Sequence, residues 1–122
     1  MMIIRALPAD PELAFNAWLD PFLMHRWMQS TPDHEIIAIE LQPRTGGNFT
    51  IVEQAGEREN RICGRFDAVE RSHHLALTLT DASAISIDIV PCESGCEVRF
   101  EPGGPRQDRW TAMIDRLVQL IG

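Results

Sequence analysis

The chain contains no lysine and no tyrosine, and all 11 of its basic residues are arginine. Acidic residues number 18, so the 122-residue chain has a formal charge of −7 at neutral pH. Nucleic acids and anionic membranes bind basic surfaces, so this charge balance argues against both as partners. No apolar run reaches the roughly 20 residues of a membrane span. The composition therefore predicts a soluble acidic protein whose partner is a small molecule or another protein.

Cysteine is also scarce. The chain has Cys63, Cys92 and Cys96, and an odd number fits a reducing compartment better than a disulfide framework. A zinc site at Cys92 and Cys96 would need two further ligands, and no second cysteine pair is present. The apolar run at the N-terminus is broken at Arg5 and is shorter than that of a secretory signal. We therefore expect a cytoplasmic protein without a metal or a cofactor.

Two aspartate-proline pairs, Asp10-Pro11 and Asp20-Pro21, follow a short apolar segment that reads as a strand over Met2–Leu7. Aspartate caps a helix by accepting the amide protons of its first turn, and proline suits the next position, where its missing N–H costs nothing. The pairs therefore predict two short helices, over Pro11–Leu19 and Pro21–Met28.

The middle of the chain alternates apolar and polar residues with a period of two, which is typical of strands. Turns are expected at Ser30–Asp33 and at Pro102–Pro105, and strands at six further places: Glu35–Leu41, Phe49–Glu53, Arg61–Glu70, Leu75–Leu79, Ile85–Ile89 and Val98–Phe100. Short turns between consecutive strands favour an antiparallel meander. The helical period then returns, with a bulky apolar stripe from Trp110 to Ile121. These patterns predict one α+β domain over residues 1–122, in which a curved sheet of six or seven strands wraps on a long C-terminal helix.

Four stretches in this order resemble a known family. They are PADPELAFNAWLDPFLMHRW from Pro8, LQPRTGGNFTIV from Leu41, GRFDAVERSHHLALTLT from Gly64, and the closing helix from Trp110. Together they are similar to the bacterial activator-of-Hsp90-ATPase-like group of the START/Bet v 1 (SRPBCC) superfamily. The resemblance covers nearly the whole chain and implies the helix-grip fold.

The helix-grip resemblance implies a cavity between the long helix and the concave sheet, which would hold an apolar or aromatic small molecule. For every residue that is expected to line this cavity, ordinary packing in the core is the alternative. The candidate lining residues lie on the apolar strand face, at one closed end, on the helical roof, or (Asn60) on a strand where an amide would orient the ligand. They are Ile37, Ile39, Phe49, Ile51, Phe66, Leu77, Ile87 and Phe100; Trp18, Phe22 and Trp27; Trp110, Met113, Ile114 and Leu117; and Asn60.

Polar residues that share the apolar faces are few. Glu53 and His73 continue those faces at strand ends, where the sequence favours exposure to solvent. His25 stands near the end of the second predicted helix, where a histidine suits the helix dipole. The arginines are expected in ion pairs on the solvent side, Arg61 and Arg65 with Asp67, and Arg109 and Arg116 with Asp115.

Three functions follow, in order of preference. The first is a binding module without chemistry. The second is an enzyme similar to polyketide cyclases or hydratases, which would need Glu53, Asn60, His73 or His25 to project into the cavity. The third is a chaperone-regulating interaction module, suggested by the family name. The protein is expected to be a monomer, or a homodimer paired through the edge strand at its N-terminus.

Overall fold

The computed structural model describes residues 2–29, 33–103 and 107–121. Its elements follow in the order β1 (Ile3–Leu7), α1 (Pro11–Asn16), α2 (Pro21–Trp27), β2 (Glu35–Leu41), β3 (Asn48–Ala55), β4 (Arg58–Glu70), β5 (His74–Leu79), β6 (Ala84–Cys92), β7 (Gly95–Pro102) and α3 (Gln107–Ile121). The expected turn residues Ser30–Pro32 and Gly104–Pro105 lie outside the described residues. The element order is the predicted one.

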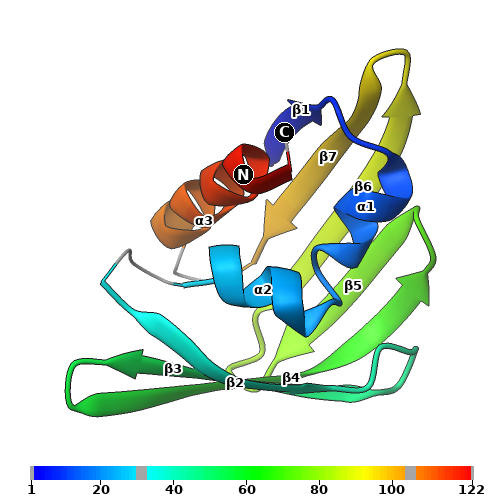
Figure 1. The fold of residues 1–122 in the computed structure, drawn as a ribbon. Coiled ribbons are helices and arrows are strands. Elements are labelled where there is room, and N and C mark those ends of the chain that lie inside the picture. Colours follow the sequence, from blue (N-terminus) through cyan, green and yellow to red (C-terminus); the bar gives the residue numbers. More distant parts are fainter. Residues whose placement is uncertain (1, 30–32, 104–106, 122) are drawn as a thin grey trace.

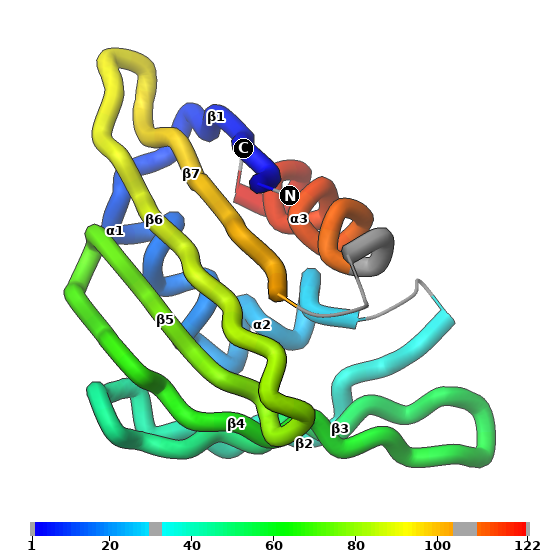
Figure 2. Tube along the Cα trace, turned by 180° about the vertical axis from the view of Figure 1, so that it is seen from behind, coloured from blue at the N-terminus to red at the C-terminus, as the bar shows by residue number. Residues whose placement is uncertain are grey.

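The described strands form a seven-stranded antiparallel sheet in the order β1-β7-β6-β5-β4-β3-β2. From β2 to β7 each strand pairs with the next one in the chain, which confirms the meander. β1 joins the far edge by pairing with β7, where Ile3 lies opposite Phe100. The sheet curves, and the helices lie along its inner side (Figures 1 and 2). The fold is therefore the α+β helix-grip fold that the sequence predicted.

Both aspartate caps form as expected. The carboxylate of Asp10 accepts the backbone N–H of Glu12 at 2.8 Å, and that of Asp20 accepts the N–H of Phe22 at 2.9 Å. However, α1 ends at Asn16, three residues before the predicted Leu19, because the chain tightens into i→i−3 hydrogen bonds. Trp18 lies in this tight turn and stacks on Phe100 of β7, with ring centroids 5.4 Å apart.

Arg116 on α3 connects this helix to the end of α2. Its guanidinium donates to the carbonyl of Trp27 at 3.4 Å and to the carbonyl of Gln29. These carbonyls lack partners within α2, so a cation is well placed there. The prediction that Arg116 faces solvent beside Asp115 is therefore wrong. Asp115 pairs instead with Arg5 of β1 at 3.0 Å, while the side chain of Arg109 lies outside the described part.

The outer side of the sheet carries polar pairs. Arg65 Nε lies 3.1 Å from Asp67 Oδ1, as the sequence predicted, and the Thr78 hydroxyl donates to Asp67 Oδ2 at 2.5 Å. The Thr78 hydrogen bond lowers the pKa of Asp67, and Arg65 adds to this effect against the opposing effect of burial. On neighbouring strands, His74 Nδ1 lies 2.7 Å from Asp88 Oδ1. The Arg65–Asp67 pair is exposed to solvent and the His74–Asp88 pair is partly so, and such pairs stabilise a fold little.

Within the described ranges, no helix combines the length and the apolar character needed to cross a bilayer.

The three cysteines all fall in the described ranges and are free thiols. Cys92 is exposed, Cys63 is half-buried, and Cys96, on β7 of the β6–β7 hairpin, is buried. In the hairpin register Cys92 lies opposite Gly95 and Cys96 opposite Pro91, so the two thiols do not face each other across the strands. Burial raises the pKa of the Cys96 thiol, and the nearby Cys92 and Asp10 raise it further.

We predict that a thiol reagent at neutral pH modifies Cys92 first, Cys63 more slowly, and Cys96 only after unfolding, because the exposed thiolate is the reactive species. Mass spectrometry of peptides from a labelling time course measures the order. The variant Cys92→Ser should lose the fast phase alone. If Cys96 in the native protein were labelled as fast as Cys92, the Cys96 side chain would not be buried as described.

Candidate ligand-binding site

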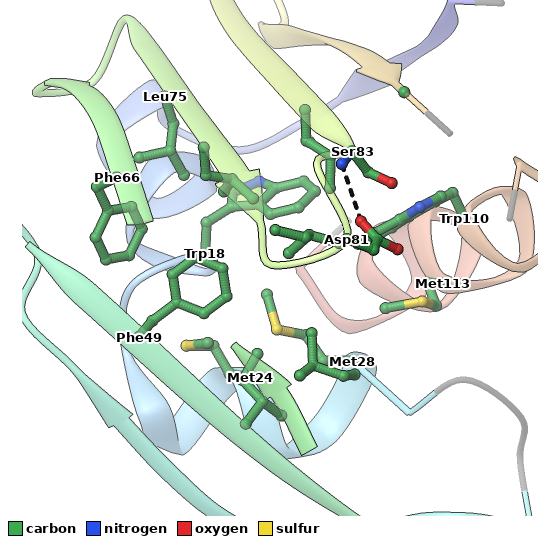
Figure 3. Close-up of a pocket in the computed structure, with 16 residues that line it drawn as sticks. Trp18, Met24, Met28, Phe49, Phe66, Leu75, Asp81, Ser83, Trp110 and Met113 are labelled. Carbon is green, nitrogen blue, oxygen red and sulfur yellow. Dashed lines mark hydrogen bonds between the residues drawn. The ribbon is translucent and has the colours of Figure 1, made fainter. Parts of the chain in front are cut away.

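A pocket lies on the inner side of the sheet, where strands β3 to β6 face α2 and α3 (Figure 3). The cavity measures about 90 Å³. In the described part of the chain it is lined by Trp18, Met24, Met28, Phe49, Ile51, Ile62, Phe66, Leu75, Leu77, Leu79, Asp81, Ser83, Ile85, Gly103, Trp110 and Met113. The wall is therefore mainly apolar, with aromatic rings and thioethers.

The sheet wall follows from the alternation of strand side chains. Phe49 and Ile51 on β3 share the inner face with Leu75, Leu77 and Leu79 on β5. Between them Gly64 on β4 leaves space that the Phe49 ring fills, because a Cβ at Gly64 would lie 2.5 Å from Phe49 Cζ. The Phe49 ring centroid also lies 5.2 Å from that of Phe66. This glycine therefore sets the position of one aromatic wall of the pocket.

The helical wall contains the adaptable side chains. Met24 on α2 and Met28 just after it are one helical turn apart, and Met113 comes from α3 (Figure 3). Methionine is unbranched and polarisable, so it fits ligands of different shape and contacts aromatic rings favourably. A cavity of about 150 Å³ in another protein holds one benzene. At about 90 Å³, this pocket is smaller than that cavity, so it takes a one-ring ligand only if the methionine side chains move.

The side-chain oxygen atoms of the described lining come from the turn between β5 and β6. Asp81 Oδ1 accepts the backbone N–H of Ser83 at 2.9 Å (Figure 3). Ala82 between them adopts a left-handed conformation, with φ of 72°, which fixes the turn. The pocket thus has one polar margin.

The indole nitrogens of two buried tryptophans differ in their partners. Trp27 Nε1 donates to the carbonyl of Ala17 at 2.9 Å. Trp18 Nε1 is buried and has no hydrogen-bond partner among the described residues, although Trp18 lines the pocket. Buried donors are normally paired, so this nitrogen is an exception that calls for an explanation.

The structure brings part of the predicted set together around the pocket. These residues are Trp18, Phe49, Ile51, Phe66, Leu77, Trp110 and Met113. A second group lies in the core but not in the described lining, namely Trp27, Ile87, Phe100, Ile114 and Leu117. Ile39 is partly buried and packs against that core.

Three predicted residues lie elsewhere. Phe22 is 66% exposed on α2, where the Arg26 guanidinium lies 4.8 Å from its ring centroid. Ile37 is 45% exposed because a register shift between Ile36 and Ala38 turns Ile36 to the buried side instead. Asn60 is exposed beside the β3–β4 turn. The predicted placement of these three in the cavity is wrong.

Other lining residues were not among the predicted ones. Ile62, Leu75, Leu79 and Ile85 lie on strand faces shared with predicted residues, so the alternation signal pointed to them. Met24 and Met28 are spaced by one helical turn, which marks one helix face. Asp81, Ser83 and Gly103 come from turns, where no periodic signal exists.

The four polar candidates for catalysis are not in the described lining. His73 and His25 are exposed, and His25 Nδ1 lies 2.8 Å from the carbonyl of Ile36. Glu53 contradicts the expectation of exposure, because it is only 1% exposed although it lies near the end of β3. His34 Nδ1 lies 3.1 Å from Glu53 Oε1, without the geometry of a hydrogen bond. In the described ranges no cluster of three or more His, Cys, Asp or Glu is placed to hold a metal.

This helix-grip fold with an apolar inner pocket matches a known family. The family model described as Activator of Hsp90 ATPase homolog 1-like protein matches residues 8–122. The chain belongs to this family. A search of curated proteins gives no match.

Solved structures of bacterial proteins share the fold. The solution structure of an AHSA1-like protein from Aeromonas hydrophila has a TM-score of 0.85 at 20% identity, covering 98% of this chain and 89% of the other. A Chromobacterium violaceum protein has a TM-score of 0.85 at 18% identity, covering 99% and 96%. A Nitrosomonas europaea protein has a TM-score of 0.83 at 20% identity, covering 98% and 92%. At these identities the likeness shows the fold alone. The family and its fold support a ligand-binding domain without naming a ligand.

Proposed function

We propose that residues 1–122 form one cytoplasmic binding domain that holds an apolar or aromatic small molecule in the pocket between the sheet and α3. The observation that carries the proposal is the lining itself, in which aromatic rings, aliphatic groups and methionines surround a cavity of about 90 Å³. Ligand pockets commonly combine such a wall with few polar groups. The protein would act as a monomer or a homodimer, without nucleic acid or membrane as partner.

The cyclase or hydratase alternative receives less support. It requires an acid or base that reaches the ligand. None of the four predicted candidates is in the described lining, and the carboxylate that is there, Asp81, already accepts the Ser83 N–H. The chaperone-regulating alternative rests on the family description alone. Binding without chemistry therefore remains the preferred function.

Tryptophan fluorescence tests the proposal directly, because the chain has no tyrosine and three tryptophans, of which Trp18 and Trp110 line the pocket. We expect single-ring compounds such as toluene or anisole to change the emission saturably and to raise the melting temperature. A panel of such compounds that changes neither quantity at its solubility limit would refute the proposal.

Filling the pocket should remove binding. Ile62 lines the pocket, so Ile62→Phe places a ring near the ligand's position and should weaken binding about 10-fold or more, since overpacking costs about 1–3 kcal/mol. The matched control is Ile37→Phe, which changes an exposed isoleucine outside the described lining and should leave the dissociation constant unchanged. Equal dissociation constants for the two variants, titrated by fluorescence, would place the ligand elsewhere.

A further inference from the structure

We propose that the ligand carries a neutral hydrogen-bond acceptor, a carbonyl or ether oxygen beside its ring, and that Trp18 Nε1 binds this oxygen. The inference rests on the proposed function and adds the chemical class of the ligand. Trp18 Nε1 is a donor without an acceptor, it is buried, and its side chain lines the pocket, in the part of the chain that is described.

The same segment shows how an indole is paired when its role is packing alone. Trp27 is fully buried and its Nε1 donates to Ala17 at 2.9 Å. Trp18 is held just as firmly, since it stacks on Phe100 at an interplanar angle of 13° and meets the Trp27 ring at 78°. Turning the ring to reach an acceptor would break both of these contacts, so the acceptor has to come to the ring. An aromatic ring face is only a weak substitute.

The described lining residues offer no good hydrogen-bond acceptor to Trp18 Nε1. Thioether sulfur is a weak acceptor, and the Asp81 carboxylate is held in its own turn by the Ser83 N–H. A buried water needs two to four polar partners, whereas the wall around Trp18 is mainly apolar. A carbonyl or ether oxygen needs only one donor, and the carbon skeleton attached to it packs against the apolar wall.

A neutral acceptor fits better than a carboxylate. Burying an anion in an apolar wall is costly without a cation, and the charged side chain in the described lining, Asp81, is itself acidic. Trp18 Nε1 is enclosed, so an oxygen reaches it only when a flexible neighbour gives way. Met24, Met28 and Met113 are the adaptable side chains of the same lining.

The test compares two ligands of nearly equal shape, acetophenone and ethylbenzene, which differ in the carbonyl oxygen. Dissociation constants are measured by calorimetry for the wild type, Trp18→Phe and the control Trp110→Phe, which changes another lining tryptophan. The ratio of the ethylbenzene to the acetophenone constant should fall about 3- to 10-fold in Trp18→Phe, the size of one hydrogen bond. In Trp110→Phe the ratio should not change. An unchanged ratio in Trp18→Phe overturns the inference.

A measurement on the unaltered protein covers the case in which Trp18→Phe folds poorly. The indole N–H signals of the three tryptophans in a ¹⁵N NMR spectrum are assigned from Trp27→Phe and Trp110→Phe, which leave the Trp18 signal by elimination. Acetophenone should shift the Trp18 signal downfield, and ethylbenzene should not. Identical shifts with both ligands overturn the inference while the proposed function stands, because both ligands then bind. If neither ligand binds the wild type, the proposed function fails together with the inference.

Discussion

Replacing Trp27 by alanine is expected to lower the free energy of unfolding by about 3–5 kcal/mol, the usual cost of emptying a fully buried aromatic position. Trp27 is 0% exposed at the end of α2 and lies edge-on against Trp18, with ring centroids 4.5 Å apart. Its loss also leaves the Ala17 carbonyl without the Nε1 donor. Urea unfolding followed by circular dichroism measures the change.

The matched control is Phe22→Ala on the same helix. Phe22 is 66% exposed and its ring contacts the Arg26 guanidinium, so the change should stay within about 0.5 kcal/mol. Trp27→Phe keeps a ring but removes the N–H, and should fall between the two. If Trp27→Ala and Phe22→Ala destabilise the protein equally, the packing of α2 against the sheet is not as described.

Phe22 and Trp27 also show which features of the fold sequence patterns predict and which they do not. The Asp10 and Asp20 caps depend on adjacent residues, so the sequence predicts both helix starts correctly. The meander depends on short turns between consecutive strands, which are also local. In contrast, the placement of Phe22 and Trp27 depends on how α2 rotates over the sheet. That rotation is fixed by tertiary contacts such as Arg116 at the end of α2.

The strands give a similar result. Alternation predicts the inner faces of β3 and β5 correctly, because these strands are regular where they line the pocket. It fails on β2, where a register shift next to Ile37 moves the side chains that follow to the opposite face of the sheet. It also fails at Glu53, since a strand end suggests exposure but the side chain is buried near His34. Neither a bulge nor a contact between residues distant in the sequence leaves a periodic signal.

The family resemblance predicts a pocket with an apolar wall, but it does not predict the polar groups of that pocket. The Asp81–Ser83 margin depends on turn geometry, and the unpaired Trp18 Nε1 depends on which carbonyls lie within reach. Both features are properties of the folded structure rather than of residue spacing.

Gly64→Ala is expected to destabilise the protein by about 1–3 kcal/mol through overpacking. An added Cβ would lie 2.5 Å from Phe49 Cζ and 2.6 Å from the Thr78 carbonyl oxygen. The Phe49 ring must shift, and because it lines the pocket, ligand affinity should fall as well. The control is Gly56→Ala, whose Cβ meets nothing within 4 Å. That variant should show only the cost of its positive φ, about 1–2 kcal/mol, and normal binding.

A double-mutant cycle with Phe49→Leu separates the ring clash from any general effect of losing glycine. Leucine at position 49 removes the ring atoms that the new Cβ would meet, so Gly64→Ala should cost less in the Phe49→Leu background than in the wild type. The remaining cost reflects the Thr78 carbonyl, which belongs to the backbone and cannot move aside. Gly56→Ala should cost the same in both backgrounds, because it lies away from Phe49. Additive costs for Gly64→Ala and Phe49→Leu would show that the glycine does not position this wall of the pocket.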